Sequence, residues 1–304
     1  MTETFSIGEA LAAPFRVIRR HPLAVFAWGF SACAFSLLTS ALMFGALADL
    51  PLMEAGRAEP PPELFGRVMA LQGLSMLANL GQLALGVVIW TATMRATLRI
   101  GRPDRYFFMR AGMDELRIGV VGIALFLGAY VAVIVLVLLG IAVGAVAWQA
   151  NEALAIVLGF IMALGLIAAV IYAMARLSLI APATLILQRF AFVEGWTLAR
   201  GRMGSLLGLL VCTWLIYMAV YFVLAFFAII AFFASGAFAH MQALGDAITF
   251  RDILPSPGVL WTLVAVVLLP GAFVYGAVMT LLCAPFASAC RQLLDGSPQG
   301  ALES

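Results

Sequence analysis

The sequence contains no lysine, and charged residues make up only 11% of its 304 residues. Soluble domains usually carry about a quarter charged residues. Because 64% of this chain is hydrophobic, it cannot cover itself with polar surface in water, and we expect a bilayer as its solvent. The net charge of +2 is too small to suggest a nucleic-acid partner.

Groups that serve in catalysis or metal binding are also scarce. The four cysteines stand in or beside apolar runs, without the clustered ligands of a zinc site or the small loop-rich chain of a disulfide scaffold. The only histidines, His21 and His240, fall on opposite sides of the membrane in the topology given below. No Walker loop, Gly-x-Ser-x-Gly or HExxH motif occurs, and no acidic residue falls inside a predicted span. We therefore expect no enzyme activity, no catalytic residue, no metal site and no cofactor.

Six apolar stretches are each long enough to cross the bilayer, which takes about 20 helical residues. They cover residues 23–48, 68–94, 118–147, 153–175, 204–234 and 259–284. The connection at residues 148–152 is so short that the third and fourth spans are expected to form a tight antiparallel hairpin. The sequence therefore predicts an all-α, polytopic integral membrane protein, with residues 1–304 as a single membrane domain of three helical hairpins.

The arginines are distributed unevenly between the two sides of this topology. Fourteen fall in the N-terminus, the tail and the two connections that share their side, whereas three fall on the other side. The positive-inside rule then places both termini in the cytoplasm. Arginine in place of lysine, with abundant Ala, Gly, Val and Leu, indicates a GC-rich bacterial genome, so we expect a bacterial inner membrane. No cleavable signal peptide is visible, and the first span is expected to act as an uncleaved anchor.

Three segments on the cytoplasmic side combine arginines with apolar residues at helical spacing. They cover residues 5–20, 104–117 and 188–202. Such segments are typical of short helices that lie in the headgroup plane of the membrane, although basic loops that only set the topology are the alternative. The apolar run that begins at residue 153 also continues past Arg176 to residue 187, with Pro182 within it. This leaves open whether residues 177–187 lie at the interface, re-enter the membrane or extend the helix.

The polar residues of these regions are the candidate binding residues. The candidate contacts for lipid headgroups are Arg176, Arg99, Arg102, Arg105, Arg110, Arg189, Arg200 and Arg202. For Arg176 the alternative is a side chain that only snorkels to the interface. Asn79 and Gln82 are candidate intramembrane polar contacts, with hydrogen bonding between helices as the alternative.

The run RLSLIAPATLILQRFAFVEGWTLARGRMGSLLG, which begins at Arg176, carries a family resemblance. It resembles the membrane domain fused to some bacterial glycerophosphoryl diester phosphodiesterases and found in stand-alone multi-pass relatives. The opening SIGEALAAPFRVIRRHP resembles the lead-in of the same family. The catalytic barrel of those enzymes is a separate soluble domain of about 250 residues that has no counterpart here. The resemblance therefore implies a membrane module without the enzyme activity. The matching positions are Arg176, Pro182, Glu194, Trp196, Leu198, Arg200 and Gly201.

These observations predict a non-enzymatic inner-membrane protein that organises lipids or partner proteins through a basic cytoplasmic face. Its expected partners are anionic lipids of the cytoplasmic leaflet and a membrane-protein partner. A transporter or exporter of a lipid-like or apolar solute is the alternative, because such a carrier needs no charged residue in its spans. An assembly factor for a larger complex is a third interpretation.

Overall fold

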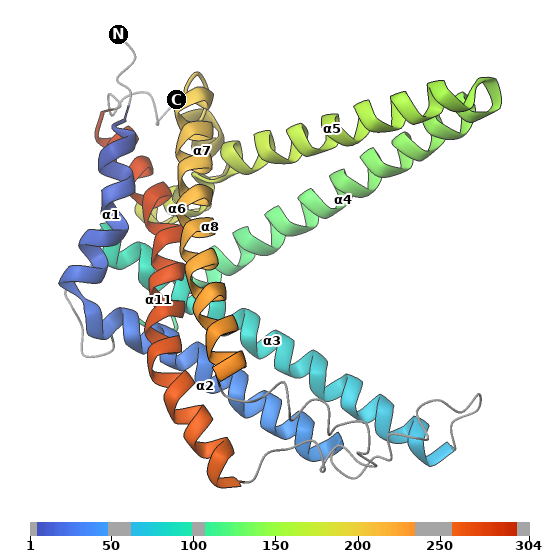
Figure 1. Cartoon of the computed structure of the whole chain (residues 1–304). Coiled ribbons are helices and arrows are strands. Elements are labelled where there is room, and N and C mark those ends of the chain that lie inside the picture. Colours follow the sequence, from blue (N-terminus) through green and yellow to red (C-terminus); the bar gives the residue numbers. More distant parts are fainter. Residues whose placement is uncertain (1–4, 48–61, 99–106, 235–256, 297–304) are drawn as a thin grey trace.

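The computed structural model describes residues 5–47, 62–98, 107–234 and 257–296 (Figure 1). Every regular element in these residues is a helix, and six of the helices are long and apolar enough to cross a bilayer. These two findings confirm the predicted all-helical class and its six candidate spans. The helices are α1 (Ile7–Arg20), α2 (Pro22–Leu47), α3 (Pro62–Leu98), α4 (Met113–Ala150), α5 (Glu152–Leu177), α6 (Ile180–Leu187), α7 (Phe192–Leu198), α8 (Met203–Ala234) and α11 (Pro257–Asp295).

Helix α1 begins and ends at residues that suit its two ends. The Ser6 hydroxyl accepts a hydrogen bond from the Glu9 backbone N–H at 3.3 Å, which satisfies one of the free donors of the first turn. Arg19 and Arg20 lie in the last turn, where cations interact favourably with the helix dipole. Pro22 then starts α2 at a first helical position, which proline tolerates well. The N-terminal amphipathic segment is therefore a helix separate from the first apolar helix.

A single residue connects α4 to α5. Asn151 ends α4, and its side-chain oxygen accepts hydrogen bonds from the backbone N–H groups of Ala153 (2.8 Å) and Leu154 (3.4 Å). This arrangement caps α5 and reverses the chain within one residue. The two helices run back along each other as an arm that projects away from the other helices (Figure 1).

The long apolar run that follows Glu152 is divided into two helices. Helix α5 ends at Leu177 and α6 begins at Ile180, so the break comes directly after Arg176. Pro182 lies in the first turn of α6, where its missing N–H costs no helical hydrogen bond. Residues 177–187 therefore do not continue α5 as a single extended helix, and their position relative to the membrane stays a prediction.

The four remaining apolar helices share one direction. In Figure 1, α2, α3, α8 and α11 extend together toward the lower end of the molecule, while the α4–α5 arm points elsewhere. Helix α11 packs more extensively against α2 than against α8, its neighbour in the predicted third hairpin. Gly276 permits this packing, because a side chain there would overlap the backbone oxygen of Val25.

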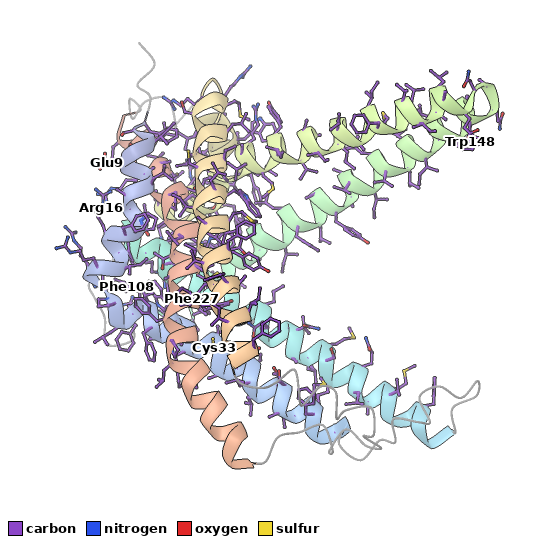
Figure 2. The ribbon with its side chains drawn as sticks, viewed as in Figure 1. Glu9, Arg16, Cys33, Phe108, Trp148 and Phe227 are labelled. Atoms are coloured by element: carbon purple, nitrogen blue, oxygen red, sulfur yellow. The ribbon has the colours of Figure 1, made fainter. Side chains whose placement is uncertain are left out.

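Most of the buried core lies at the end that carries α1, α6 and α7. Apolar residues of these helices pack there against α8 and the last turns of α3 and α11. The apolar side chains of the arm are mostly exposed, and Figure 2 places Trp148 at its tip, far from Glu9 and Arg16. The best-packed part of the protein therefore coincides with the arginine-rich end.

The predicted interfacial segments fold in different ways. Residues 5–20 contain α1, whose small residues Ala10, Ala13 and Pro14 are buried inside the protein rather than left free for a membrane. Residues 188–202 contain α7. The segment 104–117 differs from the prediction, since its described part is a turn followed by the start of α4. Phe107 and Phe108 have positive φ angles of 53° and 65°, which end any helix at that point.

Candidate functional site

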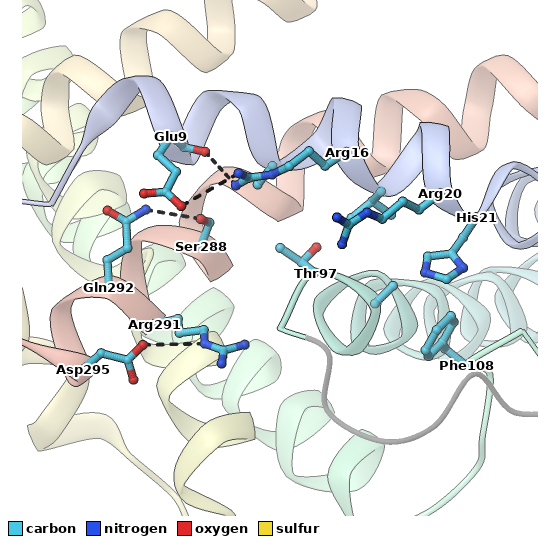
Figure 3. Close-up of a pocket in the computed structure, with 13 residues that line it drawn as sticks. Glu9, Arg16, Arg20, His21, Thr97, Phe108, Ser288, Arg291, Gln292 and Asp295 are labelled. Atoms are coloured by element: carbon cyan, nitrogen blue, oxygen red, sulfur yellow. Dashed lines mark hydrogen bonds and ion pairs between the residues drawn. The ribbon is translucent and has the colours of Figure 1, made fainter.

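A polar cavity of about 520 Å³ lies between α1 and the C-terminal ends of α3 and α11 (Figure 3). We call it the arginine cavity. Its volume lies within the range of about 300–1,000 Å³ that is usual for small-molecule sites. It is lined by Glu9, Ala13, Arg16, Val17, Arg20, His21, Ala96, Thr97, Phe108, Ser288, Arg291, Gln292 and Asp295.

Helical spacing brings the polar lining together. Glu9, Arg16 and Arg20 of α1 are seven and four residues apart, so they follow one another along one side of that helix. The polar residues of α11 that line the cavity, Ser288, Arg291, Gln292 and Asp295, follow one another at spacings of three, one and three residues and so also share one side of their helix. Two facing helix stripes therefore form the polar walls.

Two of the three arginines in the cavity have partners inside the protein. Arg16 donates to the Glu9 carbonyl oxygen at 3.2 Å and lies 3.8 Å from the Glu9 carboxylate. Arg291 donates from Nη1 to the Leu98 carbonyl oxygen at 2.6 Å and lies 3.6 Å from the Asp295 carboxylate. Both ion pairs are substantially exposed, so each is weak and open to exchange with another anion.

Arg20 is the third arginine, and it makes no hydrogen bond or ion pair with the described part of the chain. Its position in the last turn of α1 is favourable on its own, because the helix dipole attracts a cation there. The lining nevertheless contains three guanidinium groups and two carboxylates, which leaves one positive charge in excess. Figure 3 shows the Arg20 side chain in the cavity between Thr97 and His21. The arrangement suits an anionic ligand.

A buried ion cluster lies close to the cavity and fixes the start of the arm. Arg95 of α3 lies 3.0 Å from Asp114 and 2.6 Å from Glu115, the second and third residues of α4. The side chains of Arg95 and Glu115 are both almost fully buried, so this ion pair is shielded from water. Arg95 also donates to the Phe108 carbonyl oxygen at 3.3 Å. Because the cluster satisfies Arg95 internally, this arginine holds structure rather than a ligand.

Arg176, the central residue of the family resemblance, is enclosed by aromatic side chains. Its guanidinium carbon lies 3.9 Å from the centre of the Trp196 ring, which is a cation–π contact between α5 and α7. Its Nη1 donates to the Tyr172 hydroxyl at 2.8 Å. Its Nε is buried and has no hydrogen-bond partner within the described segments. In the structure Arg176 therefore links α7 to the end of α5 through its contact with Trp196.

The remaining arginines predicted as headgroup contacts fall into three groups. Arg99, Arg102 and Arg105 lie outside the described residues, and Arg110 is exposed but has an interaction of its own. Arg189 pairs with Glu194 at 3.1 Å, and Arg202 donates to the Leu198 carbonyl oxygen at 3.5 Å. Arg200 is exposed and makes no side-chain contact with the described chain.

The arginines of the cavity are not among the predicted contacts, although the stripe of α1 was visible in the sequence. Helical spacing alone places Arg16 and Arg20 together. The part contributed by Arg291 carries no sequence signal, because it lies 271 positions after Arg20 in the chain. Only the packing of α1 on α11 brings the two together.

Asn79 and Gln82 do not share a site in the structure. Asn79 lines a small cavity of about 220 Å³ between α2 and α3, together with hydroxyl and apolar side chains. Gln82 is half buried and does not line that cavity. The other lining residues are Thr39, Ser40, Met43, Phe44, Ser75 and Ala78.

The described segments contain no cluster of three or more His, Cys, Asp or Glu residues that could hold a metal ion. All four cysteines are free thiols. His21 lines the arginine cavity, where its ring packs edge-on against Phe108 at 5.4 Å between centroids. His240 lies outside the described residues.

Compared with protein-family models, curated proteins and solved structures, the chain matches none of them. The resemblance carried by Arg176, Trp196 and their neighbours therefore stays a prediction. The arginine cavity rests on the geometry of this chain alone.

Proposed function

We propose that the protein is a non-enzymatic, multi-pass membrane protein that holds anionic lipid headgroups in the arginine cavity. The observation that carries this proposal is Arg20, a guanidinium group without a partner among the described residues, which lines a cavity with one positive charge in excess. Guanidinium groups bind phosphate through paired, charge-assisted hydrogen bonds. Thr97, Ser288 and Gln292 supply further polar groups around the same space.

The topology proposed from the arginine distribution supports a headgroup as the ligand. It places the arginine cavity on the cytoplasmic side of a bacterial inner membrane, at the end of the apolar helices α3 and α11. Anionic lipids of that leaflet attract basic groups near the membrane surface. Membership of the membrane-domain family named above, as a stand-alone relative, is part of the same proposal.

Exposed apolar residues on α7 and just before it support membrane contact at the same end. Phe190, Val193 and Trp196 are 51%, 72% and 44% exposed, and Arg189 and Arg200 flank them. An apolar face with basic residues at its edges is typical of a helix that lies in the headgroup plane. We include α7 as such a helix in the proposal.

The test compares Arg20→Gln with Arg19→Gln in nanodiscs that contain a minority of anionic lipid. Both changes remove one charge from the last turn of α1, but only Arg20 lines the cavity. Loss of a charge-assisted contact predicts about tenfold weaker retention of anionic lipid for Arg20→Gln, measured by native mass spectrometry. Arg19→Gln is expected to retain the lipid.

Equal losses in both variants would indicate diffuse attraction to the surface and would remove the cavity from the proposal. Unchanged retention in both, together with binding that does not respond to salt, would refute lipid binding through this basic end altogether.

A further inference from the structure

A second cavity adjoins the arginine cavity at the last turns of α11. Its volume is about 530 Å³, and most of its walls are leucine and isoleucine. We call it the leucine cavity. Leu98 and Leu185 form its most deeply buried walls, each 2% exposed. It is lined by Leu98, Leu185, Ile186, Gln188, Arg291, Leu294 and Asp295.

The two cavities meet at one pair of side chains. Arg291 and Asp295 line both of them. The Arg291 guanidinium bonds to the backbone of Leu98, whose side chain lines the leucine cavity. A polar space and an apolar space therefore lie next to each other, with a cation at their boundary.

We propose that the two cavities form one site for a phosphate-bearing amphiphile with a single apolar chain. The phosphate lies in the arginine cavity and the chain in the leucine cavity. This inference rests on the proposed function and extends it, because it assigns the ligand an apolar subsite inside the protein. Lipids that only surround the helices would need no such subsite.

The polar half is suited to a phosphate group. A tetrahedral phosphate presents several acceptor oxygens in different directions, and donors reach this cavity from two of its sides, α1 and α11. Arg20 approaches from α1, while Arg291 and Gln292 approach from α11. The exposed pair of Arg291 with Asp295 is weak enough for Arg291 to turn toward a ligand.

The apolar half is suited to an alkyl chain. Its walls are side chains without hydrogen-bonding groups, apart from Gln188 and the shared pair. Each methylene group removed from water in such a site is expected to strengthen binding about fourfold. The gain must end once the cavity is full, whereas partitioning into a bilayer continues to grow with chain length.

The experiment measures binding of alkyl phosphates of increasing chain length to the full-length protein in zwitterionic nanodiscs. Native mass spectrometry counts ligands bound per protein, and empty nanodiscs measure partitioning. The variants are Arg20→Gln for the polar half and Ile186→Trp for the apolar half, with Ile186→Phe as a smaller filling of the same space. Thermal unfolding checks that each variant is folded.

The expected result is one bound ligand whose affinity rises about fourfold per methylene and then levels off. Arg20→Gln should weaken ligands of every length by a similar factor. Ile186→Trp and Ile186→Phe should bind the shortest phosphates normally but lose the gain from longer chains.

Two results would overturn the inference while leaving the proposed function in place. One is binding that depends on Arg20 but not on chain length, and the other is a chain-length gain that survives both changes at Ile186. No effect of Arg20→Gln on any ligand would overturn the proposed function as well.

Competition identifies the source of the ligand. A diacyl lipid with a phosphate headgroup, added to the nanodisc, displaces the alkyl phosphate if the site is filled from the bilayer. If the site is filled from water, a lysolipid phosphate added from solution displaces the alkyl phosphate and the diacyl lipid does not. Displacement by neither lipid would overturn the inference.

Discussion

Gly29 of α2 lies directly against the backbone carbonyl of Ala272 on α11, so closely that a side-chain carbon at position 29 would overlap its oxygen. One turn away, Gly276 of α11 meets the carbonyl of Val25 on α2 in the same way. The two helices therefore touch backbone to backbone at a reciprocal pair of glycines. In a bilayer, where apolar side chains gain little by leaving lipid, such close packing is a main source of helix association.

Replacing Gly29 with alanine is expected to destabilise the fold by about 1–3 kcal/mol, because α2 and α11 must separate to admit the methyl group. Gly122→Ala on α4 is the matched control, since no atom lies within 4 Å of its added carbon. Alanine should be neutral or slightly stabilising there. The measurement is the midpoint of unfolding in mixed micelles of increasing SDS fraction. Equal midpoints for the two variants would contradict the contact.

The buried cluster around Arg95 predicts a larger effect. Arg95→Met leaves Glu115, with 7% of its side chain exposed, without its cation. An uncompensated buried charge typically costs about 3–5 kcal/mol. Arg16→Met, which breaks the exposed pair with Glu9, should cost no more than about 1 kcal/mol. Adding Asp114→Asn and Glu115→Gln to Arg95→Met removes the unpaired charges and should restore part of the lost stability. A triple variant no more stable than Arg95→Met would show that unpaired buried charge is not the cause of the loss.

The cation–π contact between Arg176 and Trp196 is tested by a double-mutant cycle. Arg176→Gln and Trp196→Leu are expected to show a coupling free energy of about 0.5–2 kcal/mol in unfolding measurements. Tyr172→Phe serves as the control, because it removes only the hydroxyl that accepts from Arg176. Additive effects of the two changes would mean that the ring contact contributes nothing. An Arg176→Gln variant that loses lipid but no stability would return this arginine to the headgroup contacts.

Hydrophobic run length predicted the six apolar helices well, because each run is a local property of the chain. The turn at Asn151 was also visible as a local signal, whereas the sequence left open how the chain continues after Arg176, where the structure ends α5 at Leu177. The helix expected from residue 104 to residue 117 was not found as a separate element. Its apolar spacing was helical, but positive φ angles at Phe107 and Phe108 interrupt the backbone, and spacing does not report them.

The packing could not be predicted in the same way. Glycines occur in every span, yet those of α4 and α5 face open space or make an ordinary van der Waals contact with a side-chain atom, whereas Gly29 and Gly276 meet a neighbouring backbone. Nothing in the sequence near a glycine distinguishes these situations. The arginine cavity also arises from packing that the sequence does not reveal, because α1, the end of α3 and the end of α11 are far apart in the chain. Its charge balance becomes visible only once the partners of Arg16 and Arg291 are known.

The direction of the α4–α5 arm makes membrane topology the decisive remaining prediction. Fourteen arginines on one side of the predicted topology place the arm's tip outside and Arg200 inside. In cells with Cys33 and Cys212 changed to alanine, an impermeant maleimide should label Gln149→Cys directly, and Arg200→Cys only after the inner membrane is opened. The buried Cys283 and Cys290 should stay unlabelled.

Labelling of both engineered cysteines from one side would show that the arm does not cross the membrane. Labelling from opposite sides would show that the tip of the arm and Arg200 lie on opposite sides of the membrane, as the predicted topology requires.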